Sequence, residues 1–206
     1  MSPAPVTQFP QIIQGGMGIA VSSWQLAKEV SKSGQLGVIS GTAIDAVVAR
    51  RLQDGDPTGE IRRALSHFPD QKVVAEILNR LFIEGGRDKL KPYLDIPKLT
   101  LKPSAFTNYL LIASSFVEVW LAKENNPGQI GMNILEKIQM AIPAQLYGAM
   151  LAEVDYILIG AGIPAQVPAL LDGLAEGKPV VMKVDVDGTT ERAPLNFDPA
   201  IIENIN

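Results

Sequence analysis

Glycines at the ends of short apolar runs are the residues of this sequence that could form a binding site. They follow three runs that read as strands: Gly15, Gly16 and Gly18; Gly41; and Gly160 and Gly162. A glycine at such a place lets the backbone approach a ligand closely and leaves N–H groups free to donate hydrogen bonds. In α/β proteins ligands bind at the carboxyl ends of the strands. Any one of these glycines could simply form a turn, but three such loops at one edge favour a shared ligand site.

Reactive side chains are scarce. None of the 206 residues is cysteine, and the single histidine is His67. Disulfides, thiolate nucleophiles and zinc sites built on cysteine or on several histidines are therefore excluded. His67 lies in the segment SHFPD and reads as a residue at a helix end. The segment DVDGTTE, with Asp185, Asp187 and Glu191, lacks the ligand spacing of an EF-hand and predicts a turn, so we expect no metal site.

The glycine loops do not match the dinucleotide-binding fingerprint. QGGMGIA and IGAGIPA each contain G-x-G, but neither completes G-x-G-x-x-G, because Val21 and the pair Gln166–Val167 stand where the third glycine could lie. The run LGVIS ends in Ser40 and not in an acidic residue that would bind a ribose. A Rossmann-type dinucleotide site is therefore only a secondary alternative.

Short apolar runs alternate with longer helical patterns, which is typical of an α/β protein with parallel strands. We expect strands at Gln11–Gln14, Leu36–Ser40, Gln129–Ile134, Tyr156–Ile159 and Pro179–Val184. Because these runs are continuous and do not alternate with polar residues, both faces of each strand should be covered.

Helices are expected between these strands. One runs from Ser22 or Ser23 to Lys32, and another opens at Pro164 or Pro168 and closes at Gly177. Three aromatic residues fall on apolar helix faces and are predicted to lie in the core: Trp24, Trp120 and Tyr147.

One connection is much longer than the dozen or so residues that a crossover between parallel strands needs. Residues 43–128 read as several helices, at Ile44–Leu52, Gly59–His67, Val73–Phe82 and Ser104–Lys123. The segment Gly85–Pro103 is the most irregular part. We interpret 43–128 as a helical insertion or lid within one domain that spans 1–206.

The charge balance excludes other classes of partner. The chain has 18 Lys and Arg against 22 Asp and Glu and no long basic cluster, so nucleic-acid binding is not expected. The longest apolar stretch, Leu110–Ala122, is shorter than the roughly 20 residues of a membrane span and contains Glu118. The first residues, MSPAPVTQFPQ, show no secretory signal. These observations predict a cytoplasmic protein that acts on a small molecule and not on a membrane.

Three segments of the sequence resemble a known enzyme family. The segment PQIIQGGMGIAVSSWQLAKEVSKSGQLGVISGTAIDAVVARRLQDGDP is followed by IGMNILEKIQ and then by LYGAMLAEVDYILIGAGIP. In order and spacing they are similar to the nitronate monooxygenase (2-nitropropane dioxygenase) family, in the branch that includes enoyl reductase subunits of polyunsaturated fatty acid synthases. The similarity runs from about Pro10 to Val186. It implies a TIM (β/α) barrel that binds FMN at the carboxyl ends of its strands, here with the first five of eight strands and the helical insertion after strand two.

The resemblance also implies which residues bind the cofactor. Nine residues at strand ends would contact FMN: Gly15, Gly16, Met17, Gly18, Asn133, Gln139, Gly160, Gly162 and Lys183. For Asn133 the physical argument agrees, because an amide at the exit of an apolar strand is costly unless it is paired. Lys183 has two interpretations, a flavin contact and a structural ion pair.

Family members continue beyond strand five with a G-G-H motif, whose histidine is the usual catalytic base, and with loops that hold the FMN phosphate. This sequence ends at AIIENIN without them, so no catalytic residue is assigned. We expect an FMN-dependent oxidoreductase that oxidises a nitronate or related carbanion, with flavin-dependent enoyl-thioester reduction as an alternative. A hypothesis of another class is a non-catalytic, truncated half-barrel that acts as a structural partner, as a homo-oligomer or with a chain that supplies the missing strands.

Overall fold

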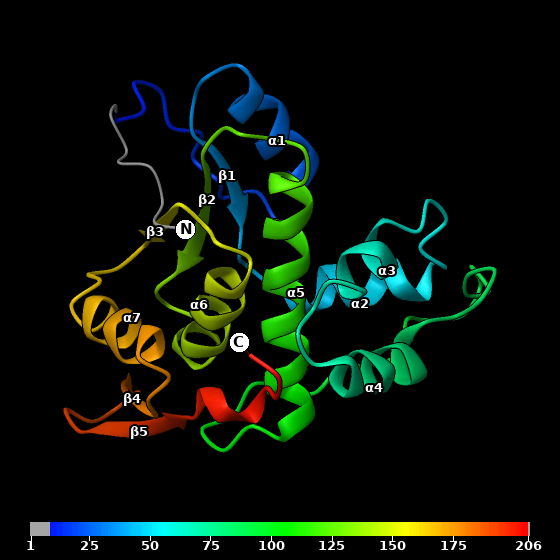
Figure 1. Ribbon diagram of the computed structural model, residues 1–206. Coiled ribbons are helices and arrows are strands. Elements are labelled where there is room, and N and C mark those ends of the chain that lie inside the picture. Colours follow the sequence, from blue (N-terminus) through cyan, green and yellow to red (C-terminus); the bar gives the residue numbers. More distant parts are fainter. Residues whose placement is uncertain (1–8, 206) are drawn as a thin grey trace.

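A three-stranded parallel sheet forms the centre of the structure, a computed structural model that describes residues 9–205 (Figure 1). Its strands are β1 (Gly37–Ser40), β2 (Ile130–Leu135) and β3 (Tyr156–Gly160), in the order β1-β2-β3. In the register of the sheet, Ser40 lies opposite Asn133, which in turn lies opposite Leu158. The mixed α/β class and these three predicted strands are confirmed, with ends that differ by one or two residues.

The first predicted strand, Gln11–Gln14, is reduced to a single parallel bridge between Ile13 and Leu36. The bridge is closed by the N–H of Leu36 on the carbonyl of Ile12 and the N–H of Gln14 on the carbonyl of Leu36, each at 3.1 Å. Beyond this point Gly16 has a φ of +66°, which ends the extended pairing, although the loop stays packed on Val38 of β1. The side-chain oxygen Oε1 of Gln14 then accepts the N–H of Val38 in place of a backbone carbonyl.

The fifth predicted strand exists, but its pairing and burial were predicted wrongly. Strand β4 (Val180–Asp185) pairs antiparallel with β5 (Arg192–Phe197) in a separate two-stranded sheet. Its residues alternate between buried and exposed, so one face meets solvent. The predicted turn in DVDGTTE is confirmed, and Gly188 adopts a φ of +80° there. The parallel sheet of residues 9–205 has three strands, and β4 lies outside it. The barrel implied by the resemblance stays a prediction.

Strand β4 is bound on its other edge by two glutamine side chains. Gln166 accepts the N–H of Lys183 and donates to its carbonyl, at 2.8 and 2.9 Å. Gln139 accepts the N–H of Asp185 at 2.7 Å. Side-chain amides thus occupy backbone groups of β4 to which a further strand would otherwise pair.

Helices surround the parallel sheet (Figure 1). Between β1 and β2 the chain forms α2 (Ile44–Gln53), α3 (Glu60–Leu65), α4 (Gln71–Leu81) and α5 (Ala105–Lys123). The remaining elements are α1 (Trp24–Lys32), the 3₁₀ turn η1 (Gln139–Ala141), α6 (Ile142–Leu151), α7 (Val167–Ala175) and the 3₁₀ turn η2 (Pro199–Ile201). The segment 82–104 between α4 and α5 contains no helix or strand, as predicted for its irregular part.

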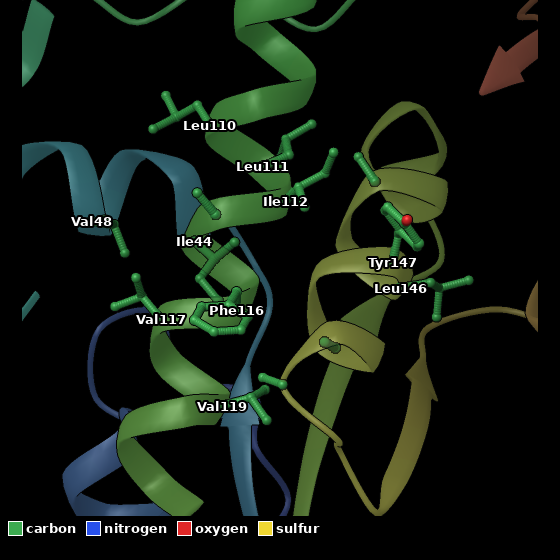
Figure 2. Packing of buried hydrophobic residues seen from close by; sticks show 14 of the residues in the cluster. Ile44, Val48, Leu110, Leu111, Ile112, Phe116, Val117, Val119, Leu146 and Tyr147 are labelled. Atoms are coloured by element: carbon green, nitrogen blue, oxygen red, sulfur yellow. The ribbon is translucent and has the colours of Figure 1, made fainter. Parts of the chain in front are cut away.

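Helix α5 is the central helix of the core and does not sit apart in a lid. Its buried side chains face α2 on one side and α6 on the other, as Val117 and Ile112 do in Figure 2. Gly148 of α6 permits the closest approach, because an added Cβ there would lie 2.1 Å from the carbonyl oxygen of Ile112. The helical region 43–128 therefore shares one core with the sheet. Of the aromatic residues predicted to be core, Tyr147 is buried, whereas Trp24 and Trp120 are half-buried.

Length and apolar composition would allow α5 to cross a membrane, but most of the helix is buried inside the described part of the chain. In its C-terminal half, Glu118 is buried and joins three helices. Its carboxylate accepts the backbone N–H of Trp24 at 2.9 Å and binds Arg51 of α2 at 2.5 Å. Glu118, and not the side chain of Ser23 at the N-cap position, therefore satisfies the first N–H of α1.

Candidate ligand site at the carboxyl edge of the sheet

The predicted residues Gly15, Gly16, Met17, Asn133 and Gly160 come together at the carboxyl edge of the parallel sheet. Asn133, near the end of β2, is 8% exposed, and its Nδ2 donates to the carbonyl of Gly15 at 2.7 Å. This bond holds the loop 15–18 against the ends of β2 and β3. The amide of Asn133 is therefore paired, as the cost of burying it demands.

Two glycines let this loop lie directly on the strand ends. A Cβ on Gly16 would lie 2.3 Å from Cγ1 of Val38, so no side chain fits there. A Cβ on Gly160 would lie 3.1 Å both from Oδ1 of Asn133 and from the sulfur of Met17. Gly15 differs, because no atom lies within 4 Å of the position of its Cβ. The loop is thus packed on one side and open at Gly15.

Gln14 belongs to this site, although sequence reasoning did not select it. Its Oε1 accepts from Val38, but its buried Nε2 has no hydrogen-bond partner in the described part of the chain. A buried donor without an acceptor costs about 1–3 kcal/mol. Its place directly before the two glycines was the only available signal.

Gln139 and Gly162 lie together in a second group. The Nε2 of Gln139 donates to Glu136 at 2.6 Å and to Asp185 at 2.9 Å. Gly162 is packed on Glu136, since an added Cβ would lie 2.4 Å from its Oε2. Both amide atoms of Gln139 are thus engaged by the protein, and they fix the β4–β5 hairpin to the end of β2.

No hydrogen bond among residues 9–205 joins Gly18 or Lys183 to Asn133 or Gly160. The carbonyl of Gly18 accepts the N–H groups of Val21 and Ser22, so this glycine forms the turn into α1. Lys183 is exposed, and within residues 9–205 no carboxylate lies within 4.0 Å of its ammonium group. The structural ion pair considered for Lys183 is therefore not formed, and its contact with a flavin stays a prediction.

His67 lies at the opposite end of the sheet. Its ring stacks on Trp120 at 4.5 Å, close to the end of α5, from which the chain enters β2. The two rings line a cavity of about 570 Å³ to which none of the nine predicted residues contributes. The prediction that His67 follows a helix end is confirmed, because α3 ends two residues before it.

The edge of the sheet carries a few groups of the kind that a flavin ring would need, but no charged phosphate site. The ring of FMN has carbonyl and N–H groups along one edge and an apolar face. The Oδ1 of Asn133 and the open backbone at Gly15 could meet the edge, and Met17 the face. No Lys or Arg belongs to this cluster. Within residues 9–205 no group of three His, Asp or Glu side chains is placed to hold a metal ion.

Comparison with known proteins does not extend this description: no protein-family model, no curated protein and no solved structure matches the chain. The structure itself defines a mixed α/β protein with a glycine loop packed on the carboxyl edge of a parallel sheet. Such an edge can bind a planar polar ligand through backbone and amide groups.

Proposed function

We propose that the chain is an FMN-dependent oxidoreductase of the nitronate monooxygenase type. The observation that carries this proposal is the position of Asn133, whose amide holds the loop 15–18 on the carboxyl edge of the sheet. The loop and the strand come from different parts of the sequence and meet at the edge where α/β proteins bind cofactors.

In this proposal the protein binds and orients the ring. The Oδ1 of Asn133 would accept from an N–H group of the ring. The sulfur and methyl group of Met17, which is half-exposed, would pack on the face of the ring. Bound FMN would supply the redox chemistry, with a nitronate or related carbanion as electron donor and oxygen as acceptor. Reduction of an enoyl thioester at the same edge is the alternative reaction.

The test is a titration of FMN with the purified chain, followed by flavin fluorescence and by the visible spectrum. Replacing Asn133 by leucine should weaken FMN binding about tenfold, the effect of one lost hydrogen bond together with a displaced loop. The matched control is Asn126→Leu, because Asn126 is equally buried but bonds to Ser31 and Ala122. A colourless chain that quenches no FMN fluorescence contradicts the proposal, as does equal weakening by both variants.

A second candidate function is favoured by apolar side chains exposed in the segment before α1. Phe9, Ile12 and Val21 are 82%, 64% and 71% exposed. We propose as the alternative that the chain is a structural partner without redox activity that associates with a second copy of itself. Analytical ultracentrifugation should then show a dimer at micromolar concentration that Ile12→Lys converts into a monomer. A monomer at all concentrations contradicts this alternative.

A further inference from the structure

A groove runs between α2 and the irregular segment 92–99. Two cavities, of about 410 and 290 Å³, adjoin there and share Ala46 and Ile96 in their walls. The outer cavity reaches Arg50 and Tyr93, and the inner one reaches Asp45 and Gln145. Each is close to or above the lower size limit of small-molecule sites, and together they form an elongated site.

The walls of the groove are mainly apolar. Small and aliphatic side chains from α2 and the residue before it, from segment 92–99 and from η1 line it: Ala43, Ala49, Leu94, Pro97, Leu99 and Ala141. Gln53 also lines the outer cavity, but its amide is bonded in both directions to the backbone of Leu94, at 2.6 and 3.2 Å. An alkyl chain would therefore find apolar contacts along the length of the groove.

Arg50, at the outer end, has no acidic partner. The six other arginines each have a carboxylate within 4.0 Å, namely Arg51, Arg62, Arg63, Arg80, Arg87 and Arg192. Within residues 9–205 Arg50 has none, although Asp95 also lines this cavity. Its guanidinium instead lies 5.2 Å from the ring centre of Tyr93. An exposed guanidinium at the rim of an apolar groove favours an anionic ligand group, and the exposed Lys98 adds a positive charge farther along.

Beside Lys98, the polar side chains of Asp45 and Gln145 line the inner cavity. The Nε2 of Gln145 donates to the carbonyl of Gly41 at 2.6 Å, while its Oε1 has no partner within residues 9–205 and is not sealed from the cavity. Burial raises the pKa of Asp45, and among the described residues no cation lies within 4.0 Å of it. The N–H of Gly41 in turn donates to the carbonyl of Asn133. The inner end therefore lies at the same edge of the sheet as the candidate ligand site.

We propose that this groove binds a small molecule with an alkyl chain, an anionic group held by Arg50 and an uncharged polar group held by Asp45 and Gln145. Medium-chain carboxylates and anionic acyl derivatives belong to this class. That this ligand is the substrate of an oxidoreductase rests on the proposed function. That it binds in the groove does not depend on that function.

The experiment titrates the flavin-free chain with carboxylates from hexanoate to dodecanoate, and with the corresponding primary alcohols, by calorimetry. We expect carboxylate affinity to rise with chain length until the groove is filled. Arg50→Gln should weaken decanoate about tenfold and leave decanol unchanged, because only the charge-assisted hydrogen bond is lost. The matched control Arg80→Gln removes an arginine that is paired with Glu76 and should change neither the decanoate nor the decanol affinity.

Ala46→Trp fills the junction of the two cavities and should abolish binding of both series, with circular dichroism used to verify that the variant is folded. The proposal is overturned if no carboxylate binds at about 1 mM, if Arg50→Gln binds decanoate as the natural chain does, or if folded Ala46→Trp still binds it. The titration of FMN is a separate measurement. A chain that binds decanoate but not FMN refutes only the oxidoreductase, and one that binds FMN but not decanoate refutes only the groove.

Discussion

Replacing Glu118 by leucine should lower the free energy of unfolding by about 3 kcal/mol. The substitution removes the carboxylate that binds Arg51 at 2.5 Å and the backbone N–H of Trp24 at 2.9 Å. Breaking a buried ion pair by removing one partner costs about 3–5 kcal/mol, because the other charge is left unpaired. Since the side chain of Arg51 is 29% exposed and can reach water, we expect a value at the low end of that range.

Urea denaturation followed by circular dichroism measures this change. If the cost comes from the unpaired charge, the double variant Arg51→Met/Glu118→Leu should be more stable than Glu118→Leu alone by about 1 kcal/mol or more. The control is Glu76→Leu, which breaks the exposed pair with Arg80 and should cost less than about 0.5 kcal/mol. The reasoning is refuted if the double variant loses as much free energy of unfolding as the two single variants lose together.

The same residue should make stability depend on pH. Burial raises the pKa of Glu118, and this effect exceeds the opposing attraction of Arg51. The folded state therefore holds this proton more tightly than the unfolded state does. Its contribution to stability falls as pH rises from the ordinary value of 4.5 through the raised pKa of the folded state. Glu118→Gln should remove this part of the decline when unfolding is compared at about pH 5 and pH 8.

Three further substitutions test other contacts. Gly148→Ala should lower the melting temperature and cost about 2–3 kcal/mol, because the added Cβ would press on the carbonyl of Ile112; an unchanged melting curve would show that α6 shifts freely. Because burial raises the pKa of Asp45, Asp45→Asn should increase the free energy of unfolding at neutral pH but not at acidic pH. An equal increase at both pH values would show that ionisation of Asp45 is not the reason. Gln53→Leu should cost about 2 kcal/mol and speed hydrogen exchange at the amide of Leu94, which NMR detects; unchanged exchange would mean that other contacts hold segment 92–99.

Features that depend on neighbouring residues could be predicted from the sequence. The strands β1, β2 and β3 arise from short apolar runs, and the helices between them from periodic patterns that end at glycine or begin at a cap. Helix α4 was expected from Val73 and begins two residues earlier, where Asp70 accepts the N–H groups of Lys72 and Val73. The approach of the glycine loop to Asn133 was also predictable, because the carboxyl ends of parallel strands meet at one edge.

Features that depend on distant partners could not be predicted. The pairing of β4 was missed for a local reason: its partner β5 follows directly across the turn around Gly188, but the apolar run 180–185 was read as a strand of the parallel sheet. Distant partners decide the amides of Gln14, Gln139 and Gln166, which bind backbone groups far along the chain. An amide can donate and accept in many geometries, so its partner is set by the fold and not by its neighbours in sequence.

The two glutamines on the free edge of β4 also affect how the protein behaves at high concentration. An uncovered strand presents N–H and C=O groups to which another molecule can pair, and such pairing begins aggregation. Gln139 and Gln166 occupy the backbone of Asp185 and Lys183, so this strand recruits no neighbour. Their amides therefore contribute to colloidal solubility, a property that the packing of the core does not control.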